Sequence, residues 1–116
     1  MNGSELLHEA GALVAAGWCQ GHEAMTADGE AADVEAEAAA RWSLLGALQA
    51  ATLSDETTRV DDVAVAVSAI AELITDPSLA NWNDQPERTS ADVGLLLERA
   101  EAIASEDLDG ADLSRS

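Results

Sequence analysis

Apolar residues recur at helical spacing in four segments of the chain, and the first of these segments covers residues 4–17. Its apolar positions lie three and four residues apart, so they form one stripe on a helix. The residues of this stripe are Leu6, Leu7, Ala10, Leu13, Val14 and Trp18. Ser4 is a suitable N-cap. We expect Gly17 to adopt the left-handed C′ conformation, so that Trp18 folds back on Leu13 as in a Schellman motif.

The longest predicted helix spans residues 33–53. Its first half is acidic, which suits the positive end of a helix dipole. Its second half, from Trp42 to Leu53, is apolar on almost every side and is expected to be buried on every side. Gly46 lowers the helix propensity by about 1 kcal/mol relative to alanine. We interpret this glycine as a point where a neighbouring helix approaches closely.

A third helix is predicted over residues 60–75, although the pattern there also fits a strand. Valine alternates with alanine over residues 63–67, which is typical of a strand, but the apolar positions also have helical spacing over about four turns. Strands average about 5–6 residues, so the length of the pattern favours a helix. Thr58, with Asp61 three residues later, resembles a capping arrangement.

A short helical turn over residues 78–81 is predicted after Asp76, which would be its N-cap, and Pro77, which would be its first helical residue. Residues 83–86 have the composition of a turn.

The last predicted helix spans residues 90–104, and Thr89, with Asp92 three residues later, caps its start. The apolar stripe ends at Ala104. Residues 105–116 combine acidic residues with serine and glycine, which predicts a disordered acidic tail.

These segments together predict an all-α fold of four main helices and one short helix. A compact antiparallel bundle and an orthogonal array both fit the lengths of the connections. A chain of 116 residues has room for one hydrophobic core, so we expect a single helical domain over residues 1–104. The predicted connection over residues 19–32 is long for a compact domain, which is typical of a functional or mobile loop.

The chain is strongly acidic, with 23 acidic residues against 5 arginines, no lysine and a net charge of -18. Direct binding to a nucleic-acid backbone or an anionic membrane needs clustered lysine and arginine, so both are disfavoured. The negative field attracts basic protein surfaces, although solubility alone also explains such a charge. The sequence has no basic leader segment and no apolar run of ~18 residues, so we expect a cytoplasmic protein.

Three tryptophans stand near polar residues, and these groups are the candidate binding residues. They are Trp18, Gln20, Trp42, Trp82, Asn83, Asp84 and Arg88. A buried indole N–H needs an acceptor, which Gln20, Asn83 or Asp84 can supply. Arg88 can pair with Asp84 across the turn. Such contacts favour a structural role for these residues, and a binding site is the alternative.

Cys19 and His22 have the C-x-x-H spacing of half a zinc site. The other histidine is His8 and there is no second cysteine, so we predict neither a metal site nor an internal disulfide. The sequence has no paired metal-binding motif, no Gly-rich phosphate loop and no recognisable partner for a nucleophile. We therefore predict no catalytic residues, no cofactor and no enzymatic activity.

Three segments together resemble a known family. They are GWCQG at residues 17–21, RWSLLGAL at residues 41–48, and WND at residues 82–84. In this order they resemble a family of small uncharacterised proteins from actinobacteria and their phages, over roughly residues 6–104. That family often has a cysteine where this chain has Ser43, and the resemblance implies no activity.

Three functional hypotheses follow from the sequence. The first is a non-enzymatic module that binds a basic surface of a partner protein, for example as an inhibitor that imitates the charge of nucleic acid. The second is a small-ligand-binding domain with a tryptophan-lined pocket closed by the loop over residues 19–32. An enzyme that uses Cys19 or Asp84 ranks last.

Overall fold

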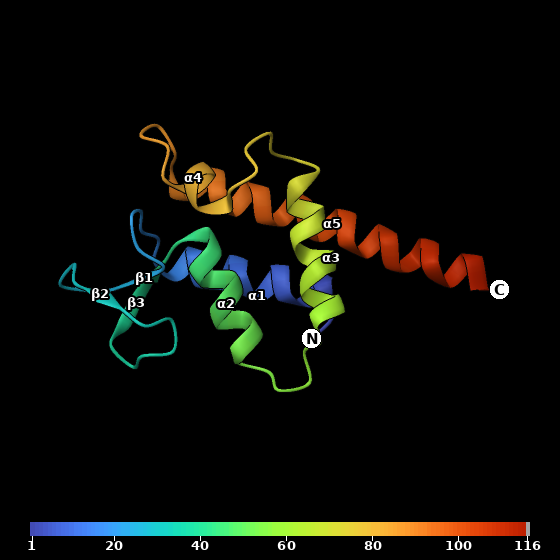
Figure 1. Ribbon diagram of the computed structural model, residues 1–116, viewed down its shortest axis with the longest axis horizontal. Helices are drawn as coiled ribbons and strands as arrows, with labels where there is room; N and C mark the ends of the chain where they lie inside the picture. Colours follow the sequence, from blue (N-terminus) through green and yellow to red (C-terminus); the bar gives the residue numbers. More distant parts are fainter. Residues whose placement is uncertain (116) are drawn as a thin grey trace.

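The computed structural model describes the backbone of residues 1–115 and the side chains of residues 1–105. Within this range, five helices and three strands follow one another (Figure 1). Their order is α1 (Gly3–Ala16), β1 (Ala24–Thr26), β2 (Ala31–Ala32), β3 (Ala39–Trp42), α2 (Leu44–Leu53), α3 (Val60–Ala71), α4 (Leu79–Asn83) and α5 (Ser90–Arg115). The fold is therefore mixed α/β. The predicted all-α class is wrong because the three strands form a sheet.

The antiparallel sheet has the strand order β2-β1-β3 and takes up part of the predicted loop over residues 19–32. β1 pairs with β2 as a hairpin and with β3 across an irregularity after Met25. The hairpin turn is closed by the Thr26 N–H, which donates to the Glu30 carbonyl at 2.8 Å. Gly29 in this turn has a φ of 89°, a left-handed value that favours glycine.

The predicted long helix over residues 33–53 is wrong in its first half, because residues 39–42 form β3. The backbone of Trp42 explains the difference. Its N–H donates to the Gly17 carbonyl at 3.0 Å, and its carbonyl accepts from the Cys19 N–H at 3.4 Å. Pairing with a distant segment thus overrides the helix propensity of the alanines before Trp42.

Ser43 starts α2, since its Oγ accepts from the Gly46 N–H at 3.0 Å. The Ser43 N–H donates to the Glu23 carbonyl at 3.0 Å, which holds α2 beside the segment before β1. A Cβ atom on Gly46 would collide with this same Glu23 carbonyl. The close neighbour of Gly46 is therefore a backbone carbonyl and not the second helix that the sequence predicted.

α1 is confirmed as a helix, but both of its predicted ends need correction. Asn2 is the N-cap in place of Ser4: its side chain accepts from the Glu5 N–H at 2.8 Å, and the Glu5 carboxylate accepts from the Asn2 N–H at 3.0 Å. Gly17 has a φ of -179°, which is extended backbone and not the predicted left-handed C′ conformation. A Cβ atom on Gly17 would collide with the Ala40 carbonyl, so close packing explains this glycine.

α3 is confirmed as a helix within the predicted residues 60–75. Its N-terminal hydrogen bond lies one residue later than expected. The Arg59 N–H donates to the Asp62 carboxylate at 2.9 Å, in place of the predicted arrangement of Thr58 and Asp61.

α4 is the predicted short helix, but it begins after Ser78 and not after Asp76. The Ser78 side chain accepts from the Asn81 N–H at 3.2 Å. Asp76 instead accepts from the Ser78 N–H at 2.9 Å, which forms a turn around Pro77.

α5 starts with the predicted capping pair. The Asp92 N–H donates to Thr89 Oγ1 at 3.2 Å, and the Thr89 N–H donates to the Asp92 carboxylate at 3.0 Å. The helix extends to Arg115, beyond the predicted end at Ala104. The division between a domain over residues 1–104 and a disordered tail over residues 105–116 stays a prediction.

α1 lies at the centre of the molecule, where it packs against α2, α3 and α5. α2 and α3 both pack on α1, and α3 also packs on α5. The buried core comprises Leu6, Leu7, Ala10, Val14, Leu44, Ala47, Leu48, Ala51, Ala66, Ala69, Ile70, Val93, Leu96, Leu97, Ala100 and Ala104. Among the helices of the described part of the chain, none combines the length and the apolar character that a membrane crossing needs.

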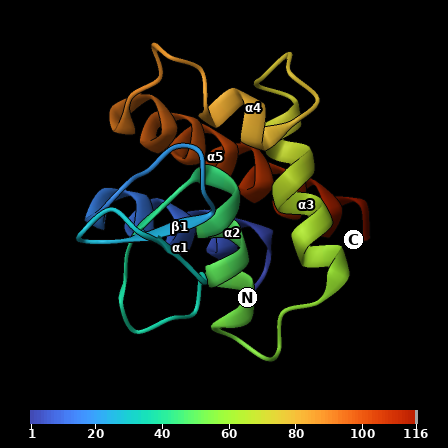
Figure 2. The same cartoon turned by 60° about the vertical axis from the view of Figure 1, so that its left-hand side comes forward.

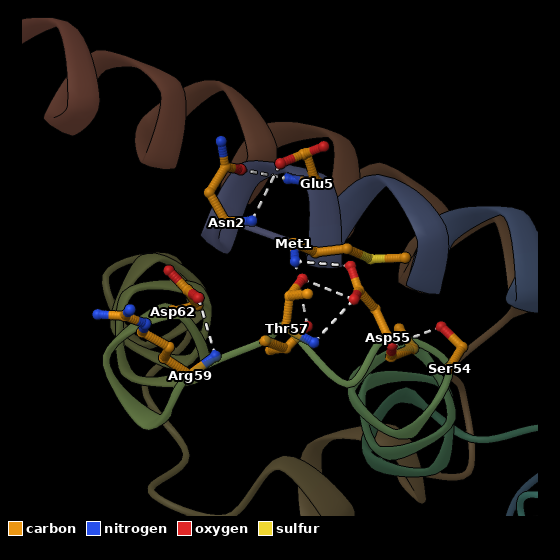
Figure 3. A network of polar contacts seen from close by, with 10 residues as sticks. Met1, Asn2, Glu5, Ser54, Asp55, Thr57, Arg59 and Asp62 are labelled. Carbon is orange, nitrogen blue, oxygen red and sulfur yellow. Dashed lines mark hydrogen bonds and ion pairs between the residues drawn. The ribbon is translucent and has the colours of Figure 1, made fainter.

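A polar network ties the start of α1 to the connection between α2 and α3 (Figure 3). The Met1 α-ammonium donates to Asp55 Oδ2 at 2.9 Å and to Thr58 Oγ1 at 3.2 Å. The Asp55 carboxylate also accepts from the backbone N–H of Thr57 at 2.9 Å and from its hydroxyl at 2.6 Å. The ammonium and then Thr57 hold the pKa of Asp55 well below its usual range, and Asp55 raises the pKa of the ammonium.

The ion pair between Met1 and Asp55 makes stability depend on pH in a defined window. A lowered carboxyl pKa gives stability that is lost as the pH falls below about 4, and a raised ammonium pKa gives stability that is lost as the pH rises above about 8. We therefore expect Asp55→Asn to reduce the free energy of unfolding most near neutral pH. Urea melts at several pH values, with Asp61→Asn as a charge-matched control, measure this. An Asp55→Asn deficit of the same size at every pH would contradict the expectation.

Candidate functional site

Asn83, the last residue of α4, lies at the centre of a polar cluster that joins all three tryptophan-containing segments. Its side chain is 0% exposed. The Oδ1 atom accepts from the Trp18 indole N–H at 2.7 Å and from the Leu44 backbone N–H at 3.0 Å. The Nδ2 atom donates to the Cys19 carbonyl at 3.1 Å and to Asp84 Oδ1 at 3.0 Å. Every donor and acceptor position of this amide is thereby used.

Gln20 and Asp84 extend this Asn83 cluster to the surface. Gln20 Nε2 donates to the Asn83 carbonyl at 2.9 Å and to the Gln85 carbonyl at 2.8 Å. Asp84 Oδ1 accepts from the Gly21 N–H at 2.9 Å. The candidate residues Trp18, Gln20, Asn83 and Asp84 are thus brought together. Because the indole N–H of Trp18, the whole amide of Asn83, Gln20 Nε2 and Asp84 Oδ1 bond to one another or to backbone, the geometry favours a structural role.

Trp82 and Arg88 form a separate pair between α4 and α5. The Arg88 guanidinium lies 3.7 Å from the centroid of the Trp82 ring, and Arg88 Nε donates to the Trp82 carbonyl at 2.9 Å. This cation–π contact replaces the predicted pairing of Arg88 with Asp84, which is not among the ion pairs of the described residues. Arg88 therefore closes the turn between the helices.

Trp42 makes its indole hydrogen bond outside the Asn83 cluster. The indole N–H donates to the Val34 carbonyl at 3.3 Å, so it fixes the connection between β2 and β3. The backbone of Trp42 pairs with that of Trp18 through an isolated parallel bridge.

Cys19 and His22 are close in space, but not as metal ligands. Cys19 Sγ donates to the His22 carbonyl at 3.5 Å, while the His22 side chain is exposed. Burial, and then the charge of Asp84, raise the pKa of the Cys19 thiol, which disfavours the nucleophilic thiolate. The described residues contain no group of three or more His, Cys, Asp or Glu side chains arranged to hold a metal ion.

A small hollow lies beside the Asn83 cluster. It has a volume of about 210 Å³ and is lined by Gly21, His22, Glu23, Ser43, Leu45, Ala80 and Asp84. Of the predicted binding residues, Asp84 alone lines it, and no tryptophan does. The volume is below the ~300–1,000 Å³ of typical small-ligand pockets.

A larger apolar groove lies over the outer face of α2, with a volume of about 380 Å³. We call it the α2–α3 groove, and it is lined by Val34, Leu45, Leu48, Gln49, Thr52, Leu53, Val63 and Val67. Residues of α2 form its floor, Val34 forms one wall, and α3 forms the other. Figure 2 shows α2 between the connection that holds Val34 and helix α3. None of the predicted binding residues lines this groove.

The match to a family model covers residues 2–103, which include the Asn83 cluster and the α2–α3 groove. This chain belongs to the family of unknown function DUF6197. It matches none of the curated proteins and none of the solved structures. Membership in DUF6197 thus confirms that the chain belongs to a family of unknown function, and it assigns no activity to either site.

The sequence did not predict the groove of this DUF6197 chain, because helical spacing alone does not show which face of α3 is buried. Val60, Val63 and Val67 share a face with helical spacing, yet Val60 is 84% and Val67 is 38% exposed. The buried side of α3 is formed instead by Ala66, Ala69 and Ile70. The signal in the sequence was a helix that is apolar over more than one face.

Proposed function

We propose that this domain is a non-enzymatic protein-binding module whose acidic surface binds a basic surface of a partner protein. The observation that carries the proposal is that few of the described acidic side chains form ion pairs within the domain. The chain has 23 acidic residues, and among the described side chains those in ion pairs are Asp55, with the Met1 ammonium, and Glu101, with His8. The remaining charge is available to an outside partner.

The kind of partner follows from the sign of this charge. Phosphate backbones and anionic lipid surfaces are repelled, so we propose no direct contact with nucleic acid or membrane. A basic groove of a nucleic-acid-handling enzyme fits a surface of this charge, and the module would inhibit that enzyme by imitating its substrate. The resemblance to proteins of actinobacteria and their phages supports a cytoplasmic target of this kind.

Capture from an actinobacterial lysate tests the proposal. We expect the immobilised domain to retain a basic protein at about 50 mM salt and to release it at about 500 mM, because salt screens exposed charges. Leu7→Asp, which places a charge in the core and unfolds the domain while keeping its acidity, is the control. The proposal would be refuted by a partner that binds with the same affinity at both salt concentrations. It would also be refuted by a partner that binds the unfolded control as tightly as the folded domain.

A small-ligand-binding domain is the alternative, and the hollow beside Asp84 is the observation that favours it. The segment at Gly21–Glu23 lines this hollow, as the predicted loop was expected to do, although no tryptophan forms its floor. A thermal-shift screen against nucleotides and metabolites separates the two functions. A ligand that stabilises wild type but not Ala80→Trp, which fills the hollow, would support the alternative.

A further inference from the structure

The α2–α3 groove offers an exposed apolar surface that the fold does not cover. Leu53 is 53% exposed and Val67 is 38% exposed, and both line the groove. Val60, at 84% exposed, continues the stripe of Val67 to the start of α3. These residues are three of the five large apolar side chains that are exposed in the described part of the chain. Such a concentration on one face is typical of a protein-interaction surface.

Helix packing and one tryptophan hydrogen bond hold the sides of the groove in place. α2 and α3 both pack on α1, and the connection over residues 54–59 links them (Figure 2). The far wall is held by Trp42, whose indole N–H donates to the Val34 carbonyl at 3.3 Å. The lining residues of α2 run from Leu45 to Leu53, so the groove extends for about 12 Å along this helix.

Acidic side chains flank one edge of the groove. Asp33, Glu35 and Glu37 are exposed in the segment that holds Val34, which lines the groove. A segment that enters the groove with apolar side chains would thus meet carboxylates at the Val34 edge.

We propose that the α2–α3 groove binds an amphipathic helix of a partner protein, with an apolar stripe on the floor and lysine or arginine at the Val34 edge. The length of the groove fits about two turns of a helix, and anchors at i, i+4 and i+7 would match its floor. A second copy of this chain fits less well, because two surfaces of the same negative charge would face each other. This inference rests on the proposed function and names the site through which it acts.

The test uses a display library of helical peptides of about 14 residues, in which apolar, basic and acidic residues are varied. Selection on the full chain is expected to enrich peptides with one apolar stripe and flanking lysine or arginine. Leu53→Gln with Val67→Gln is expected to weaken the enriched peptides about tenfold or more, since it removes the apolar contacts at unchanged charge. Leu73→Gln with Leu95→Gln is the matched control, because these leucines are similarly exposed outside the groove.

The contribution of the carboxylates beside Val34 is tested with the same peptides. Glu35→Gln with Glu37→Gln is expected to weaken binding several-fold more than Glu72→Gln with Glu98→Gln, which makes the same change in net charge elsewhere. All four glutamates are exposed.

Three outcomes would overturn the inference. The enriched peptides could be basic but have no apolar stripe, and could bind the groove variant normally. This result would refute the groove as the binding site and would leave the proposed binding of basic surfaces unchanged. Failure of every basic peptide to bind would remove both proposals. A dimer in light scattering that the groove variant dissociates would show that a second copy is the occupant.

Discussion

Gly46→Ala is expected to destabilise the domain by about 3 kcal/mol, although alanine is the better helix former. Gly46 is buried in α2, and a Cβ atom there would collide with the carbonyl of Glu23. This carbonyl cannot move away freely, because it accepts from the Ser43 N–H at 3.0 Å and from the Ser43 hydroxyl at 3.4 Å. The substitution therefore pushes α2 away from the segment that leads into β1.

Gly94→Ala provides the control for this prediction, because it makes the same change in a helix where space is open. Apart from the neighbouring residues and backbone of its own helix, no atom lies within 4 Å of a Cβ atom on Gly94, so we expect stabilisation by about 0.5–1 kcal/mol. Urea unfolding of both variants measures the contrast. If Gly46→Ala also stabilised the domain, the close packing of α2 on Glu23 would be refuted.

Asn83→Asp is expected to cost on the order of 4 kcal/mol, despite the nearly identical shape of the two side chains. The Nδ2 atom donates to the Cys19 carbonyl and to Asp84 Oδ1. A carboxylate oxygen in its place would face two acceptors with no proton to share. The charge would also be buried, since Asn83 is 0% exposed.

Asn81→Asp is the matched control, because Asn81 is exposed and lies two residues earlier in the same helix. We expect it to change stability by less than about 0.5 kcal/mol. Denaturant melts followed by circular dichroism compare the two variants. A loss of less than about 1 kcal/mol for Asn83→Asp would mean that the Asn83 cluster does not hold the three segments together.

The helices that the sequence predicted well are those with an amphipathic stripe and a local cap. The stripe of α1 and the Thr89–Asp92 pair of α5 are local features, so they can be read from neighbouring residues. The sheet could not be predicted in this way. β2 consists of Ala31 and Ala32 alone, and β3 starts with two alanines, a residue that favours helix. β2 pairs with β1 across a short hairpin, while β3 depends on backbone hydrogen bonds to residues far away in the sequence, such as Gly17.

The Asn83 cluster was predicted in its chemistry but not in its geometry. A buried indole needs an acceptor, and Asn83 was a candidate, but the indole that it serves is Trp18, 65 residues away. The expected pair of Arg88 and Asp84 is replaced by stacking on Trp82, because a guanidinium can satisfy a ring face and a carbonyl at once. Only the fold decides between such partners.

The separate environments of the three tryptophans give the domain its own optical reporters. The chain has no tyrosine and no phenylalanine, so its ultraviolet fluorescence comes from tryptophan alone. The Trp18 indole is hydrogen-bonded to Asn83, and the Trp82 ring lies against the Arg88 guanidinium. The Trp42 indole is hydrogen-bonded to the carbonyl of Val34, which lines the groove. Emission from Trp42 therefore reports on the groove through Val34, and a chain in which Trp18 and Trp82 are replaced by phenylalanine would follow its occupancy without any attached dye.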